Sequence, residues 1–196
     1  MRFYRLVILI AVALVAAAAG PYRPDARLAL ARWFNSGRCI QLDQLAARQF
    51  GAHAKPPPTM KSAFEVLQFG PTFNPDAMVV VDKSSLERRL AYGYDPKAGI
   101  ALRHQGGEDC CAAYTLRFVG KPPLALPRAD LSQNHVKTGL RLGMSAHNVV
   151  AALGEPLILR GCGVSRYVYR TSGPEDQVSF TIKNGRIVEI YIEESG

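Results

Sequence analysis

The sequence lacks the short motifs by which many enzymes are identified. It has no Gly-x-Ser-x-Gly elbow, no phosphate-binding loop, no His-Glu-x-x-His pair and no dinucleotide fingerprint. Tryptophan occurs once, and the four histidines are scattered along the chain. These absences favour a non-catalytic protein without a cofactor over a hydrolase, a nucleotide-dependent enzyme or a zinc peptidase.

The sequence also lacks a concentrated basic stretch. Lysine and arginine together number 24 against 16 acidic residues, but the charges are interspersed and Arg88-Arg89 is the only adjacent basic pair. Nucleic-acid binding usually needs a basic face, so this class is disfavoured. The net charge of +8 still leaves open a mild attraction to anionic lipid head groups or acidic proteins.

One apolar run stands at the start of the chain. Arg2 and Arg5 precede fourteen apolar and alanine residues from Leu6 to Ala19. A basic start, a short apolar core and small residues at its end indicate a secretory signal over residues 1–19. The alternative is an uncleaved anchor over residues 6–22 that holds the protein at the inner membrane. Both predict an exported, periplasmic or envelope-associated protein.

Residues 20–58 are predicted to be helical and then extended. Helical spacing over 25–34 turns Leu28 inward, and a second helix is expected over 40–50. The proline triplet at residues 56–58 predicts a stiff linker. The alternative for this region is a mobile spacer between a membrane anchor and the folded part.

Residues 59–126 change to strand-like alternation broken by turn residues, which predicts an antiparallel meander. The expected strands cover residues 64–69, 78–81, 100–103 and 112–119, and residues 86–94 form either a fifth strand or an irregular edge.

Residues 127–196 contain a helix followed by a second meander. Ser145 is a suitable N-cap for a helix over 146–153, Gly154 stands where helices end, and Pro156 prevents continuation. So short a helix needs a sheet to pack on. After a Gly/Cys loop, strands are expected over residues 165–170, 178–182 and 188–192.

The register of the last hairpin can be predicted from its Asn-Gly turn at 184–185. A two-residue loop would pair Phe180 with Glu189 and put a carboxylate on the apolar face. A three-residue loop over 183–185 pairs Phe180 with Val188 instead, and it is the preferred register. The other face of the hairpin is then half polar, as expected for a face exposed to water.

These residues together resemble the SmpA/OmlA (BamE-like) domain over roughly residues 135–193. The resemblance is carried by Gly143-Met144-Ser145, Asn148-Val149, Leu153-Gly154, Pro156, Tyr167, Tyr169, Phe180 and Asn184-Gly185. It implies two short helices on one face of an antiparallel sheet, a fold shared with the β-lactamase-inhibitor-protein group. It also implies binding of envelope proteins or lipids without catalytic residues. The outer-membrane assembly member of the family has a lipidated cysteine at its mature N-terminus, whereas the first cysteine here is Cys39.

The predicted fold class is therefore α+β, with short helices packed on one face of antiparallel sheet. Two arrangements remain open. The meander and the BamE/BLIP-like module form a tandem of two units, or the module adds its strands to one continuous sheet.

Four cysteines fit an oxidising compartment, where an even number indicates disulfides. Cys110 and Cys111 are adjacent, and neighbouring side chains on a strand point to opposite faces. We therefore expect one of them to bond Cys39 and the other to bond Cys162. A Cys110–Cys111 bond is an alternative. A thiol or metal site built on Cys110, Cys111 and Cys162 is another, although paired zinc-ligand spacings are absent.

Tyr167, Tyr169 and Tyr191 are the predicted binding residues, because tyrosine combines a large contact area with a polar tip. The alternative is that they pack in the core and across strands. The resulting hypothesis is a non-catalytic envelope protein that binds another envelope protein. Inhibition of a secreted or periplasmic hydrolase is the alternative function.

Overall fold

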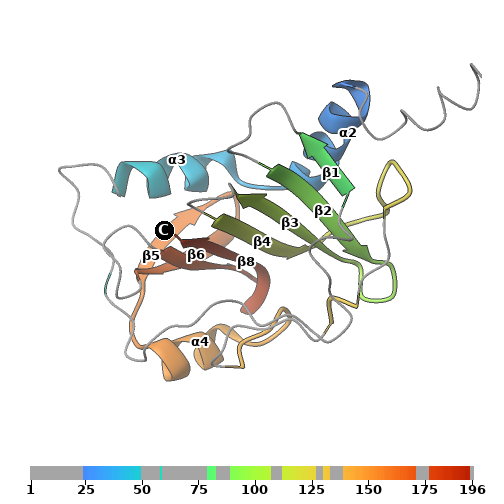
Figure 1. Cartoon of the computed structure of the whole chain (residues 1–196). Helices are drawn as coiled ribbons and strands as arrows, with labels where there is room; N and C mark the ends of the chain where they lie inside the picture. The colour runs from blue at the N-terminus through green and yellow to red at the C-terminus, as the bar shows by residue number, and fades with distance from the viewer. Residues whose placement is uncertain are drawn as a thin grey trace, which may run out of the picture.

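The fold is α+β, with three helices and eight strands in the part of the chain that the structure describes (Figure 1). The computed structural model describes residues 24–49, 58, 79–82, 89–106, 112–126, 130–132, 139–170 and 177–194. The helices are α2 (Pro24–Asn35), α3 (Ile40–Gln49) and α4 (Ala146–Leu153). The strands are β1 (Val79–Asp82), β2 (Arg89–Asp95), β3 (Ile100–Gly106), β4 (Ala112–Phe118), β5 (Leu157–Gly161), β6 (Val164–Arg170), β7 (Gln177–Lys183) and β8 (Arg186–Glu194).

All eight strands belong to one antiparallel sheet in the order β1-β2-β3-β4-β8-β7-β6-β5. The pairing of β4 with β8 joins the predicted meander to the C-terminal strands, so the continuous-sheet arrangement is the one observed. Strand β5 was not expected, because its residues were assigned to a Gly/Cys loop. It forms a hairpin with β6 through Cys162 and Gly163, which both have positive φ.

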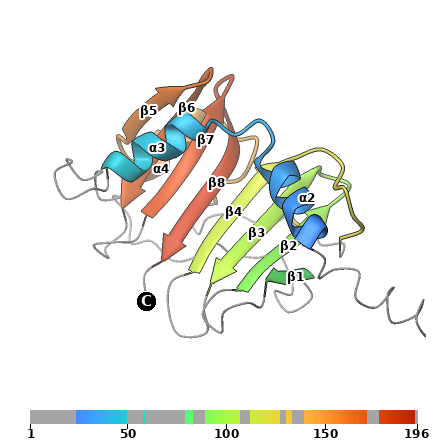
Figure 2. The same cartoon turned by 90° about the horizontal axis from the view of Figure 1, so that it is seen from above.

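The helices cover both faces of the sheet, so the expectation that they share one face is wrong (Figures 1 and 2). Helix α4 packs Val149 and Leu153 into a core that includes Leu102 of β3. The adjacent residue Ala101 belongs instead to the core beneath α2. Successive side chains on a strand point to opposite faces, and this part of β3 is apolar on both.

The predicted helices over 25–34 and 40–50 are confirmed, with one error in orientation. Leu30 and Phe34 of α2 are buried, whereas Leu28 is 51% exposed. Leu42 of α3 is fully buried in a core that includes Val168 of β6. Both helices are thus packed on the sheet and are not a spacer.

The observed register of the last hairpin differs from both of the predicted registers. The loop has two residues, with Lys183 opposite Arg186. An irregularity between Thr181 and Ile182 then leaves Val188 as an extra residue on β8, so that Phe180 pairs with Ile190. This bulge turns Glu189 away from the α4 core. A two-residue loop therefore does not place a carboxylate on the apolar face, which was the reason for preferring the three-residue loop.

The predicted caps of α4 are confirmed. The Ser145 hydroxyl accepts from the Asn148 N–H (3.3 Å), and the Asn148 side chain accepts from the Ser145 N–H (3.2 Å). Gly154 ends the helix at φ 88°, and its carbonyl accepts from the buried Tyr169 hydroxyl (2.8 Å). The free carbonyl at this helix end therefore has a partner in the sheet.

Some predictions lie outside the described residues: the signal over 1–19, the strand over 64–69, and Pro56 and Pro57 of the linker. Pro58 is described, and its carbonyl accepts from the N–H of Arg170 (3.2 Å). Among the described helices, none has the length and apolar character needed to cross a membrane.

Replacing Tyr169 with Phe should lower the free energy of unfolding by about 1–3 kcal/mol, because the Gly154 carbonyl loses its buried donor. Urea denaturation measures this. Tyr167→Phe is the matched control, since Tyr167 is only partly buried on the same strand, and it should change stability by less than about 0.5 kcal/mol. Equal losses of unfolding free energy in the two variants would show that the hydrogen bond from Tyr169 to the helix end contributes no more to stability than the Tyr167 hydroxyl does.

Candidate functional site

Polar side chains occupy the sheet face beneath α3 on four neighbouring strands. Strand pairing places Arg117 opposite Glu189, Glu189 opposite Thr181, and Thr181 opposite Arg166. This row crosses β4, β8, β7 and β6, so it joins side chains from distant parts of the chain. The prediction that this face is exposed to water is wrong for Glu189, which is 4% exposed.

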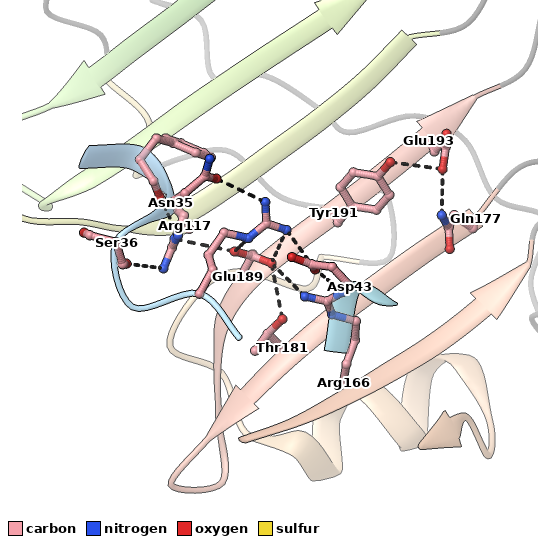
Figure 3. A network of polar contacts seen from close by, with 12 residues as sticks. Asn35, Ser36, Asp43, Arg117, Arg166, Gln177, Thr181, Glu189, Tyr191 and Glu193 are labelled. Atoms are coloured by element: carbon pink, nitrogen blue, oxygen red, sulfur yellow. Dashed lines mark hydrogen bonds and ion pairs between the residues drawn. The ribbon is translucent and has the colours of Figure 1, made fainter. Parts of the chain in front are cut away.

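Glu189 is the centre of an ion-pair cluster with three arginines (Figure 3). Its carboxylate oxygens lie 3.3 Å from Nε and from Nη2 of Arg38, 3.5 Å from Nε of Arg117, and 3.6 Å from Nη2 of Arg166. The Thr181 hydroxyl donates to the same carboxylate (3.4 Å). The Glu189 side chain is only 5% exposed, so one negative charge is shared by three cations with little access to water.

Asp43 extends the cluster to the first turn of α3. Its Oδ1 accepts from Nη1 of Arg166 at 2.7 Å and lies 3.5 Å from Nη2 of Arg38. The Asp43 side chain is 39% exposed, so it forms the solvent side of the cluster.

Arg117 connects the cluster to the end of α2. Its guanidinium donates to the carbonyls of Phe34 and Ser36 and lies 5.7 Å from the centroid of the Phe34 ring. Carbonyls at a helix C-terminus lack partners within the helix and favour a positive charge. Burial lowers the pKa of Arg117, and the neighbouring Glu189 opposes that shift.

A cleft of about 600 Å³ lies beside this cluster, between α3 and the sheet. Helix α3 contributes Asp43, Ala46 and Ala47 to one wall. The floor is formed by small side chains of the central strands, Ala113, Thr115 and Ser179. The remaining lining residues are polar: Arg38, Arg103, Gln105, Arg166, Gln177, Tyr191 and Glu193.

Positive charge predominates around the cleft. Among the described residues, the cluster and the cleft together contain four guanidinium groups and three carboxylates. Glu193 already accepts from the Gln177 amide (2.6 Å) and the Tyr191 hydroxyl (3.0 Å). Burial and the adjacent Glu193 raise the pKa of Tyr191, so its hydroxyl remains a donor at neutral pH.

The three predicted binding tyrosines do not form one surface. Tyr169 is fully buried in the core beneath α4, and Tyr167 packs against the same core, so the prediction is wrong for Tyr169. Tyr191 lies on the opposite face and lines the cleft. Tyr167 and Tyr169 are two residues apart on β6 and so share a face, whereas the neighbours of Tyr191 on β8 point into the α4 core.

The structure contains a disulfide between Cys39 and Cys162, with the Cα atoms 5.7 Å apart. The preferred pairing of each with Cys110 or Cys111 is therefore wrong, because folding brings the start of α3 against the β5–β6 turn. Cys110 and Cys111 lie outside the described residues. Cys162 is not free for the alternative thiol site, and no metal-binding group of three His, Cys, Asp or Glu occurs in the described ranges.

The cluster and cleft arginines were not predicted as site residues. A usable signal was the period-two polar pattern on strands whose other face is apolar, such as Thr115 with Arg117 and Glu189 with Tyr191. That pattern also fits a face exposed to water, so it does not by itself predict a covered site.

The chain was compared with family models, curated proteins and solved structures, and none of them matches it. The class must therefore be taken from the fold and the site: an α+β protein with one continuous antiparallel sheet and an arginine-rich cleft beneath α3.

Replacing Glu189 with Gln should lower the free energy of unfolding by about 3–5 kcal/mol, because three largely buried guanidiniums lose their shared counter-charge. Asp43→Asn is the control, since that carboxylate is partly exposed, and it should cost less than about 1 kcal/mol. Urea denaturation of both variants at neutral pH tests this. A loss below 1 kcal/mol for Glu189→Gln would contradict a central role for the ion pairs.

Non-reducing peptide mapping should recover a peptide pair that joins Cys39 to Cys162. Removing this bond in a Cys39→Ser/Cys162→Ser variant should cost about 3–5 kcal/mol, since the bond closes a loop across 123 positions. Chemical denaturation measures the loss. A map in which Cys39 is joined to Cys110 or Cys111 would rule out this arrangement.

Proposed function

We propose that this protein is a non-catalytic, exported binding protein of the cell envelope that holds a segment of another envelope protein in the cleft beneath α3. The observation that carries the proposal is the cleft itself, a concave site of about 600 Å³ with excess positive charge. Specific binding sites are typically concave, with a few polar groups that orient the ligand.

The construction of the cleft supports binding. Arg38 and Arg166, on its wall, are held in place by Glu189 and Asp43 before any ligand arrives. A site that is already ordered loses little conformational entropy on binding. Arginine and tyrosine, which line this cleft, are also the residue types that contribute most often to binding hot spots.

The exported location is supported by the N-terminal sequence and by the disulfide, because stable disulfides are typical of oxidising compartments. The resemblance to the SmpA/OmlA domain implies envelope-protein binding. In this region the chain forms α4 and then the four strands β5 to β8, one strand more than the expected module has. The hydrolase-inhibitor alternative is supported by the fold resemblance alone.

Filling the cleft should weaken partner binding without unfolding the protein. Ala47 is an exposed alanine of α3 that lines the cleft, so Ala47→Trp places an indole at its wall. Ala151→Trp is the matched control, because Ala151 is an exposed alanine of α4 on the opposite face. The tagged full chain is cross-linked in its cell envelope, captured and analysed by mass spectrometry, and each recovered partner is then purified and titrated.

The expected result is a partner that binds the wild type and Ala151→Trp, and that binds Ala47→Trp at least about tenfold more weakly. Equal binding to both tryptophan variants, or the absence of any reproducible partner, would reject the cleft as the binding site.

A further inference from the structure

We infer that the cleft recognises a carboxylate group of the bound segment and that Arg103 is the residue that binds it. This inference rests on the proposed function and adds the chemistry of the ligand. It follows from the position of Arg103, from the pairing of the other arginines, and from the charge balance around the cleft.

Arg103 lines the cleft from β3, a strand that contributes none of the cluster residues named above. Strand pairing places Arg103 opposite Thr115, Thr115 opposite Tyr191, and Tyr191 opposite Ser179. Neighbouring strands are about 4.8 Å apart, so this row spans roughly 14 Å across the floor of the cleft. The small side chains of Thr115 and Ser179 leave space above that floor, with Arg103 at one end of the row.

Arg103 differs from the other arginines in how it is paired. Arg38, Arg117 and Arg166 each lie within ion-pair distance of Glu189. Within the described residues, the guanidinium of Arg103 has instead the neutral Gln105 side chain, to which its Nη2 donates (2.9 Å). Among those residues, Arg103 is therefore the cleft arginine that has no carboxylate partner.

Four buried donors of the cluster and the cleft lack a hydrogen-bond partner within the described structure, namely the Nε atoms of Arg38, Arg103, Arg117 and Arg166. Those of Arg38 and Arg117 lie within ion-pair distance of Glu189, whereas no such contact is made by the Nε of Arg103 or Arg166 within those residues. A buried donor without an acceptor is unfavourable, so these guanidiniums have hydrogen-bonding capacity that the described residues do not use. The planar guanidinium matches a carboxylate with two parallel hydrogen bonds.

The charge balance favours a carboxylate over a phosphate. The described part of the cluster and cleft has four guanidiniums and three carboxylates, so one added negative charge neutralises this group. A phosphate carries about two negative charges at neutral pH and would also face Asp43 and Glu193 in the same cleft. An aspartate or glutamate side chain, or a C-terminal carboxylate, of the partner fits this balance.

The test is a binding titration of the folded, full chain with fluorescently labelled hexaglutamate, with hexaglutamine and a phosphoserine peptide of equal length as comparison probes. Arg103→Gln removes the proposed contact. Arg48→Gln is the matched control, because Arg48 is an exposed arginine of α3 that does not line the cleft. Arg103→Lys keeps the charge but loses the paired hydrogen bonds.

Hexaglutamate should bind the wild type more tightly than either comparison probe. Its affinity should fall at least about tenfold in Arg103→Gln, fall less in Arg103→Lys, and change less than about threefold in Arg48→Gln. Hexaglutamate should also raise the melting temperature of the wild type but not that of Arg103→Gln. Because Arg103 has no carboxylate partner within the described residues, Arg103→Gln should itself remain as stable as the wild type.

Equal loss of affinity in Arg103→Gln and Arg48→Gln, or tighter binding of the phosphoserine peptide, would overturn the inference. The same variants applied to a captured partner separate this failure from failure of the proposed function. A partner lost in Ala47→Trp but retained in Arg103→Gln leaves the cleft as the binding site and refutes carboxylate recognition. A partner unaffected by Ala47→Trp refutes the proposed function itself.

Discussion

The interaction on which the rest of this structure depends is the contact of Glu189 with three arginines. Arg38 comes from the turn between α2 and α3, Arg117 from β4 and Arg166 from β6. One buried carboxylate thus joins helices and strands that are far apart in the sequence. Buried ion pairs are favourable only while their partners are complete, because an unpaired buried charge costs several kcal/mol. The position of α3 over the sheet is therefore linked to the integrity of this cluster.

The cluster in turn depends on the bulge in β8. The sequence Ile187-Val188-Glu189-Ile190 places two core residues three positions apart, which regular strand alternation cannot bury on one face. The extra residue Val188 allows Ile187 and Ile190 both to reach the α4 core and turns Glu189 toward α3. A local irregularity of the backbone thereby directs a charge to the covered polar face.

The cleft results from where α3 is attached. Leu42 and the Cys39–Cys162 disulfide hold α3 over the β5–β6 side, and α2 covers β2 and β3 (Figure 2). Between them, small floor residues leave a polar hollow above β4, β8 and β7. Within the described residues, Arg38 and Arg166 pair with carboxylates of the cluster, whereas Arg103 has the neutral Gln105 side chain as its partner.

Local sequence determined the helices and most of the strands, because a cap such as Ser145, a stop such as Gly154 and period-two alternation act within a few residues. It predicted the α+β class on these grounds. It did not determine β5, the bulge at Val188, the side of the sheet that each helix covers, or the disulfide partner of Cys39. Only the tertiary structure decided these, because they depend on contacts between distant segments: Arg38 and Glu189 are 151 residues apart. A polar face looks the same in sequence whether it is covered by water or by a helix, and only the tertiary structure shows that α3 covers this one.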